Sequence, residues 1–195
     1  MKLLIATTNA GKRKEFVSLL EGSNLQLIFP DELGIKMDVE ETGNTYAENA
    51  ILKAEELCKL SGLVTLADDT GLEVGALGGR PGLYSARYSR AVVNSDAGRR
   101  TELLKELTQF PQPWSARFVC VAVVAFPGEI TQTFDGEVAG EIVQQERGDY
   151  GFGYDRIFLV SNLGKTMAEL NLDEKNRYSH RAIAVNKAKV ILQVP

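Results

Sequence analysis

Residues 118–126 are almost wholly apolar and rich in β-branched side chains. Such a run is typical of a central strand that is covered on both faces, because a strand with one solvent face alternates apolar and polar residues. Shorter apolar segments at 3–6 and 64–67 alternate along the chain with segments of helical periodicity. We therefore expect a mixed α/β protein.

Four segments are expected to be helices, because they combine apolar residues at helical spacing with capping residues. They are 11–20, 45–60, a segment that follows a cap at Asn94, Ser95 and Asp96, and 179–192. Further strands are expected at 130–134, as a hairpin partner of 118–126 across Pro127 and Gly128, and at 138–143 and 157–160. The length of 195 residues suits one domain, 1–195, and we expect it to be bilobed around a cleft.

Composition argues against several classes of protein. The chain has 22 basic and 26 acidic residues, a formal net charge of −4, whereas nucleic-acid polymers require a basic face. No apolar run approaches the roughly 20 residues of a membrane helix. Cys58 and Cys120 lie in apolar patterns outside any C-x-x-C pair, which indicates buried thiols in a reducing cytoplasm. A zinc site built on several His and Cys is not expected, because His180 is the one histidine.

The segment containing Thr7, Thr8, Asn9 and Lys12 lies where a strand is expected to end and a helix to begin. Backbone N–H groups at a helix N-terminus attract anions, and the lysine adds a full positive charge. It is not a Walker A loop, which needs a leading glycine and a Ser or Thr after the lysine. The residues alone leave open phosphate binding or a capped helix with a solvated lysine.

Two acidic segments could hold a divalent cation. Glu40 and Glu41 lie in an expected loop, and Asp68 and Asp69 follow the expected strand 64–67. Magnesium usually takes one or two carboxylates together with substrate phosphates. Carboxylates at strand ends also lie where α/β sheets place ligands, which favours Asp69. The alternative is a pair of polar turns, since Asp-Thr-Gly favours turns.

Residues 148–155 place three glycines around several aromatic side chains, an arrangement that can expose a ring for stacking on a base. A hairpin turn is the alternative. Charge is distributed unevenly along the chain: residues 31–56 contain eight acids and two lysines, whereas 165–195 contain six basic residues and three acids. This division suits a site in which the acidic segment holds a metal and the basic segment holds phosphate. In the basic segment, His180 is interpreted as either a structural or a ligand-binding residue, and Arg181 offers a forked donor.

Together and in this order, five motifs resemble the inosine triphosphate pyrophosphatase family. They are ATTNAGK at 6–12, EETGNTYAENAILKA at 40–54, ADDTGLEVGALGGRPGLYSARYS at 67–89, GFGYD at 151–155 and EKNRYSHR at 174–181. The resemblance implies a mixed twisted sheet flanked by helices, with a central substrate cleft. It also implies magnesium-dependent cleavage of dITP, ITP and XTP between the α- and β-phosphates, which releases pyrophosphate and cleanses the nucleotide pool.

By the same resemblance, Asp69 would hold Mg²⁺ with Glu40 or Glu41 and would be the base that activates water. The residues that would bind the phosphates and the adjoining part of the substrate are Thr7, Thr8, Asn9, Lys12, Lys53 and Thr70. The base pocket would be formed by Phe152, which stacks, and by Gly153, Tyr154, Asp155, Lys175, His180 and Arg181. The last two of these would recognise a 6-keto purine.

Two positions depart from the family pattern: Arg156 stands where Pro is usual, and Thr8 replaces a common Gly. The alternative function is a non-catalytic purine nucleotide sensor that uses the same pocket. Its sequence signature would be the loss of Asp69 or of the metal carboxylates, and both are present. The resemblance further implies a homodimer, and a cytoplasmic location is expected because no signal-peptide core follows Met1.

Overall fold

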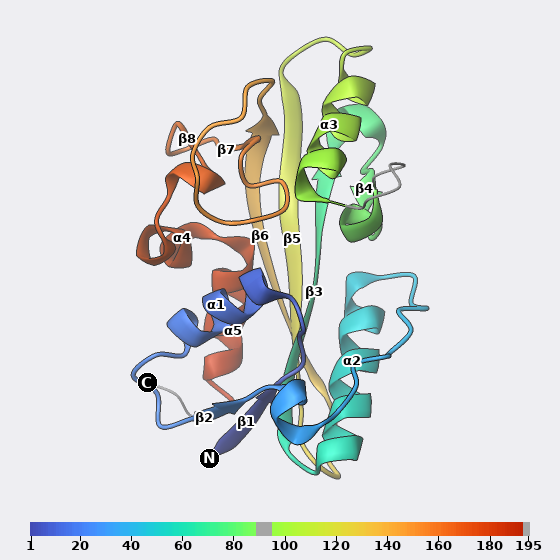
Figure 1. Ribbon diagram of the computed structural model, residues 1–195, viewed down its shortest axis with the longest axis vertical. Helices are drawn as coiled ribbons and strands as arrows, with labels where there is room; N and C mark the ends of the chain where they lie inside the picture. Colours follow the sequence, from blue (N-terminus) through green and yellow to red (C-terminus); the bar gives the residue numbers. More distant parts are fainter. Residues whose placement is uncertain (89–94, 193–195) are drawn as a thin grey trace. The chain divides into compact units, whose positions relative to one another are not determined.

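The computed structural model describes residues 1–88 and 95–192 (Figure 1). This part of the chain forms two compact units. Unit 1 contains residues 1–69 and 120–136 and the described residues from 180 onward, and unit 2 contains the described residues of 70–119 and 137–179. Three long strands, β3 (Val64–Val74), β5 (Trp114–Ala125) and β6 (Gln132–Ile142), continue from one unit into the other.

The strands form one mixed sheet in the order β2-β1-β3-β5-β6-β7-β8, with β4 paired to β3. β1 is parallel to β2 and β3, whereas the pairs β3–β4, β6–β7 and β7–β8 are antiparallel. The remaining strands are β1 (Lys2–Ile5), β2 (Gln26–Ile28), β4 (Pro81–Gly82), β7 (Phe158–Val160) and β8 (Lys165–Thr166). A mixed sheet flanked by helices confirms the expected fold class.

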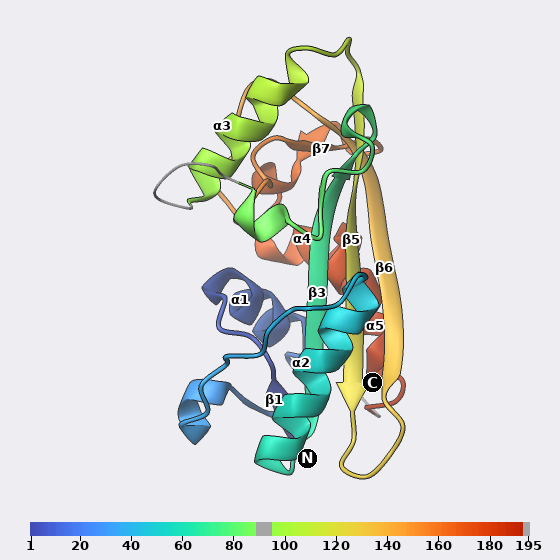
Figure 2. The ribbon, with the colours of Figure 1, turned by 90° about the vertical axis from the view of Figure 1, so that its right-hand side faces the viewer.

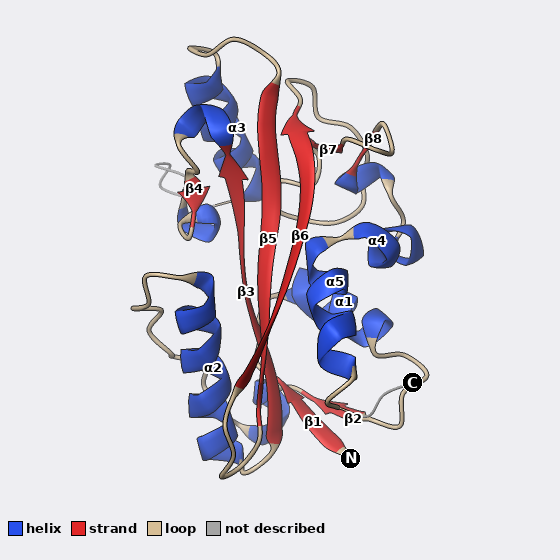
Figure 3. Ribbon diagram, turned by 180° about the vertical axis from the view of Figure 1, so that it is seen from behind, coloured by secondary structure: helices blue, strands red, loops and turns tan. Residues whose placement is uncertain are grey.

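In unit 1 the sheet is covered on both faces, because alternate residues of each strand pack against different helices. Leu3 and Ile5 belong to the core formed with α1 (Ala10–Leu19) and α5 (His180–Lys189). Leu4 faces the other way, into the core formed with α2 (Tyr46–Ser61) (Figure 3). Both faces of β5 are buried over residues 120–125, which confirms the expectation for the apolar run 118–126.

In unit 2 the sheet has one covered face. α3 (Asp96–Leu107) contributes Leu103 and Leu107 to a core that contains Trp114 and residues of β3, β6 and β7 (Figure 2). The opposite face is polar, and there Arg117 lies 2.8 Å from Glu73 and 3.1 Å from Glu137. The other helices are α4 (Leu172–Tyr178) and the short 3₁₀ helices η1 (Pro30–Leu33), η2 (Gly75–Leu77), η3 (Ser85–Arg87) and η4 (Met167–Glu169).

All four expected helices are present, within a few residues of their expected bounds. Ser95 caps α3 through its hydroxyl, whereas Ser89 and Asn94 lie outside the described residues. The expectation of separate strands at 130–134 and 138–143 was wrong, since both belong to β6. Gly136 lies in the interior of β6. A Cβ at this position would lie 2.1 Å from the carbonyl oxygen of His180, so the close packing requires glycine. This glycine marks close strand–helix packing rather than a turn.

Several smaller expectations can also be compared with the structure. Cys58 and Cys120 are buried free thiols, as their apolar context predicts. α4, β2 and β8 were not predicted from the sequence. Within the described ranges, no helix is long and apolar enough to cross a membrane.

Candidate functional site

The N-terminus of α1 in unit 1 is organised by two local hydrogen bonds. The side-chain oxygen of Asn9 accepts from the backbone N–H of Lys12 at 3.0 Å, and the hydroxyl of Thr7 accepts from the N–H of Asn9 at 3.2 Å. Thr7 is buried, whereas Thr8 and Asn9 are exposed. The helix cap is therefore confirmed, but Lys12 is not a solvated lysine, because its side chain is 16% exposed and its ammonium lies 3.0 Å from Asp68. Phosphate binding at this segment stays a prediction.

Asp68 and Asp69 lie inside β3, because the strand continues through them to Val74. The alternative of a polar turn at these residues is therefore wrong. β1 pairs with β3 only as far as Leu66, so both aspartates lie just beyond the carboxyl end of β1, where α/β sheets place ligands. Successive side chains of a strand point to opposite faces of the sheet, so Asp68 and Asp69 contact different residues.

Asp68 lies on the face that carries α1 and α5. Its carboxylate is 3.0 Å from the Lys12 ammonium and accepts from the Arg181 guanidinium at 3.1 and 3.0 Å. Arg181 also donates to Glu15 of α1. Arg181 is 1% exposed, and although its burial opposes the charged form, Asp68 and Glu15 raise its pKa further above the ordinary value. Three buried charged side chains are thus joined in one ion-pair network.

Asp69 lies on the other face, toward α2. Its Oδ1 atom is 3.5 Å from the Lys53 ammonium, and its Oδ2 atom accepts from the Asn49 amide at 3.4 Å. Burial raises the pKa of Asp69, and the opposing effects of Lys53 and Lys12 do not cancel that increase. A carboxylate whose pKa is raised binds a proton more readily, which suits a general base.

Lys53 connects Asp69 to the loop that precedes α2. Its ammonium lies 2.7 Å from Glu41, and the loop is held close to α2 by the N–H of Gly43, which donates to Asn49 at 2.8 Å. A Cβ at Gly43 would lie 2.6 Å from the Cβ of Glu48, so this approach requires glycine. Burial lowers the pKa of Lys53, but the neighbouring carboxylates, with Asp69 the strongest, outweigh it and raise the pKa overall. Lys53 is therefore a charged ammonium between two carboxylates.

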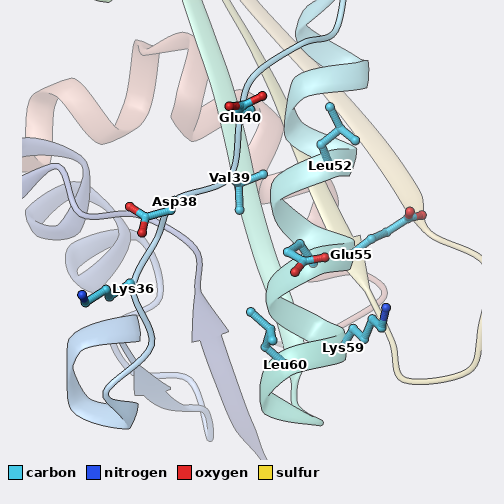
Figure 4. A pocket seen from close by; sticks show the side chains of 9 residues that line it. Lys36, Asp38, Val39, Glu40, Leu52, Glu55, Lys59 and Leu60 are labelled. Carbon is cyan, nitrogen blue, oxygen red and sulfur yellow. The ribbon is translucent and has the colours of Figure 1, made fainter.

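Glu40 has different surroundings from Glu41. It is exposed and lines a surface pocket of about 550 Å³ between its own segment and α2 (Figure 4). Leu52, Glu55 and Lys59 of α2 form the opposite wall of this pocket. The structure therefore brings Glu41, and not Glu40, to Lys53 and Asp69.

Unit 2 contains the aromatic loop, defined here as residues 151–155, together with Lys175. The Lys175 ammonium lies 2.5 Å from Oδ2 of Asp155, and the same oxygen accepts from the N–H of Phe152 at 2.9 Å. Lys175 also lies 5.1 Å from the centre of the Phe152 ring. Tyr154 is a core residue whose hydroxyl donates to the carbonyl of Ser85. Of the two rings in the loop, Phe152 is the one that is partly exposed for stacking.

The candidate site residues expected from the sequence are distributed over the two units. Unit 1 contains Thr7, Thr8, Asn9, Lys12, Glu40, Glu41, Lys53, Asp69, His180 and Arg181, and unit 2 contains Thr70, Phe152, Gly153, Tyr154, Asp155 and Lys175. Glu15 and Asn49 were not predicted, although each contacts a residue that was. Asp68 was named only within an acidic segment that could hold a divalent cation, whereas its carboxylate pairs with Lys12 and Arg181. Glu15 had no local signal in the sequence.

The fold and these side chains define an α/β protein with lysines, carboxylates and a helix N-terminus gathered at the ends of parallel strands. Such an arrangement is typical of enzymes that bind phosphates together with a metal. The chain belongs to the Ham1 family, whose family model matches residues 3–191.

Relatives and solved structures agree with this assignment. The chain is 46% identical to a dITP/XTP pyrophosphatase of Bacillus subtilis, over 97% of this chain and 96% of the relative. It is similar to the structure of the Staphylococcus aureus Ham1 protein, with a TM-score of 0.86 and 42% identity over 99% and 98% of the two chains. It is also similar to a HAM1 protein from Coxiella burnetii, with a TM-score of 0.88 and 37% identity over 99% and 98%. The family expected from the five motifs is confirmed.

Proposed function

We propose that this protein is a magnesium-dependent pyrophosphatase that hydrolyses dITP, ITP and XTP between the α- and β-phosphates. The products are the nucleoside monophosphate and pyrophosphate, so the reaction removes non-standard purine nucleotides from the pool. The name of the Bacillus subtilis relative, dITP/XTP pyrophosphatase, supports the substrate class. The observation that carries the proposal is that Glu41 and Asp69 both lie close to the Lys53 ammonium, just beyond the carboxyl end of β1. Lys12 of α1 pairs with the neighbouring Asp68.

The charges in unit 1 support a role for magnesium. Its cluster contains three cations, Lys12, Lys53 and Arg181, and four carboxylates, Glu15, Glu41, Asp68 and Asp69, for a net charge of −1. A triphosphate of about four negative charges therefore needs additional positive charge to bind here. In the described residues no three His, Cys, Asp or Glu side chains form a closed metal cage. Magnesium usually takes only one or two carboxylates from a protein and completes its coordination with phosphates and water. Glu41 and Asp69 would provide that number of carboxylates.

The residues of the chain have distinct tasks in the proposed reaction. The N-terminus of α1 and Lys12 bind phosphate oxygens, and Lys53 neutralises charge that develops on them. Asp69 accepts the proton of the attacking water, while Asn49 and Lys53 fix the direction of its carboxylate. When bound between Glu41 and Asp69, Mg²⁺ would supply Lewis-acid stabilisation of the phosphate oxygens.

The family resemblance assigns recognition of the base to three residues. Phe152 provides a stacking surface, and His180 and Arg181 donate to the 6-keto oxygen. The ion pairs of Arg181 with Asp68 and Glu15 fix the direction of its guanidinium, so it is a pre-organised donor. An amino group at position 6 would leave such a buried donor unpaired, which disfavours adenine.

A substrate panel tests the proposed function. With Mg²⁺, dITP, ITP and XTP should be cleaved at least about a hundredfold faster than dATP, the discrimination expected when a buried donor loses its partner. Pyrophosphate and orthophosphate should be scored separately, and pyrophosphate should be the product. Release of orthophosphate alone, or equal turnover of dITP and dATP, would contradict the proposal. Tight binding of dITP without turnover would favour the sensor instead.

We also propose that the protein is a cytoplasmic homodimer, as expected from the family resemblance and from the buried free thiols. Equilibrium sedimentation of the full chain should give a species of twice the 21.4 kDa chain mass. A sample that sediments only at the single-chain mass at micromolar concentration would contradict the dimer.

A further inference from the structure

One face of α3 in unit 2 combines core packing with two charged side chains. Leu103 and Leu107 are fully buried, and Asp96 and Arg100 lie on the same face at spacings of three and four residues. Arg100 is only 7% exposed although its side chain is charged. A buried arginine on a well-packed helix requires compensating contacts, and these identify what the helix supports.

Those contacts hold both backbone polar groups of Gly153 in the aromatic loop. Oδ2 of Asp96 accepts from the Gly153 N–H at 2.6 Å, and Nη1 of Arg100 donates to the Gly153 carbonyl at 2.8 Å. Gly153 has a φ of +62°, a left-handed conformation that favours glycine. The two side chains therefore fix the backbone immediately after Phe152.

The rest of the Arg100 guanidinium binds the segment that leads into the loop. Its Nε and Nη2 atoms donate to the two carboxylate oxygens of Glu146 at 2.7 and 3.1 Å. Arg156 lies 3.7 Å from the same glutamate and 3.0 Å from Asp149, so the segment is tied on both sides of the loop. These ion pairs restrain the position at which the family usually has Pro.

Phe152 consequently lies between two restraints in the same unit. On one side its own N–H donates to Asp155, which is paired with Lys175. On the other side, the next residue is held by α3. Stacking on a base requires a ring of fixed position, because ordering a mobile ring at the moment of binding lowers the affinity.

We propose that Arg100 and Asp96 are positioning residues for nucleobase recognition, which hold the Gly153 backbone so that the Phe152 ring is set for stacking. The inference rests on the proposed function for the identity of the base. It assigns α3 to the base end of the substrate and gives it no part in phosphate binding. Neither residue is among those that the sequence pattern selects for substrate contact.

The test compares Arg100→Met with Arg117→Met. Methionine keeps the apolar stem of arginine and removes the guanidinium. Arg117 is the control, because its guanidinium also bridges two carboxylates of unit 2, Glu73 and Glu137, and it lies on the polar face of the sheet. In the full-length protein, hydrogen exchange of the segment 146–156 should become faster in Arg100→Met and should not change in Arg117→Met.

Kinetics separate this role from a general structural one. Arg100→Met should raise KM for dITP and the inhibition constant of dIMP by about tenfold, the size expected when stacking on an aromatic ring is weakened. The inhibition constant of pyrophosphate, which has no base, should stay within about twofold of wild type, and kcat should fall less than KM rises. Arg100→Lys should give intermediate values, because one ammonium cannot make all the bonds of the guanidinium fork.

The outcomes distinguish this inference from the proposed function. If wild type releases no pyrophosphate from dITP, the proposed function fails, whereas hydrogen exchange still tests whether α3 holds the loop. Unchanged exchange in Arg100→Met would overturn the positioning role. Faster exchange with unchanged dIMP inhibition, or an equal loss of dIMP and pyrophosphate binding, would overturn the link to base recognition. If Arg100→Met does not fold, Asp96→Asn and Arg100→Lys provide the same comparison.

Discussion

Asp69→Asn is expected to lower kcat for dITP hydrolysis by at least about a thousandfold, because in the proposed reaction one carboxylate serves as the base and as a ligand of the metal. The amide has nearly the same shape but cannot accept the proton of water and is a weak metal ligand. The fold should be retained: burial already disfavours the charged form of Asp69, and Lys53 keeps its ion pair with Glu41. Steady-state kinetics with dITP and thermal unfolding of the same samples measure the two effects.

Asp31→Asn is the matched control for this substitution. Asp31 is an exposed aspartate of unit 1 that forms an ion pair with Arg13, 3.0 Å away. The control should keep wild-type kcat within about twofold and stability within about 1 kcal/mol, since exposed ion pairs contribute little. If Asp69→Asn retained a tenth or more of the wild-type rate, Asp69 would not be the base.

Arg181→Met should produce the largest loss of stability, because it leaves two buried carboxylates without their shared cation. The side chains of Glu15 and Asp68 are 5% and 1% exposed, and Asp68 also lies 3.0 Å from the Lys12 ammonium. Breaking a buried ion pair in this way typically costs about 3–5 kcal/mol. Denaturant unfolding at neutral pH should therefore show a free energy of unfolding lower by about that amount.

Two further variants separate the loss of pairing from the loss of packing. Arg13→Met removes a half-buried arginine of the same unit, whose ion pair is with the exposed Asp31, and should cost less than about 1 kcal/mol. Glu15→Gln and Asp68→Asn, added to Arg181→Met, remove the negative charges that Arg181 balanced and should recover part of the lost stability. A triple variant less stable than Arg181→Met alone would show that packing, and not charge, accounts for the effect.

The local sequence pattern was sufficient to predict most helices and strands. It was insufficient where packing between residues distant in sequence determines the structure. The helices at 10–19 and 46–61 follow from apolar periodicity and from the caps Asn9 and Thr45. The prediction divided β6 into two strands, whereas Gly136 continues the strand between them. This glycine is small enough to let β6 contact the backbone of α5. Such a contact joins residues distant in sequence, and no local periodicity contains it.

The expected site was likewise predicted in part. Residue type and motif order select candidate metal carboxylates and candidate phosphate-binding residues, whose roles stay predictions, and they do not distinguish Glu40 from Glu41. Only Glu41 reaches the Lys53 ammonium, because the loop is bound to α2 through Gly43 and Asn49. The support of the aromatic loop by Arg100 was invisible in sequence, since more than fifty positions separate Arg100 from Gly153.

The sequence by itself determined the α/β class, the family and the set of ionisable side chains available for chemistry. These depend on composition, periodicity and motif order, which are properties of neighbouring residues. The tertiary structure decided which charge pairs with which. Asp68 and Asp69 are adjacent in sequence, yet the strand directs Asp68 to Lys12 and Arg181 and Asp69 to Lys53 and Asn49. The formal net charge of −4 says nothing of these pairs, because ion pairing depends on distances of a few ångströms that only the folded chain sets.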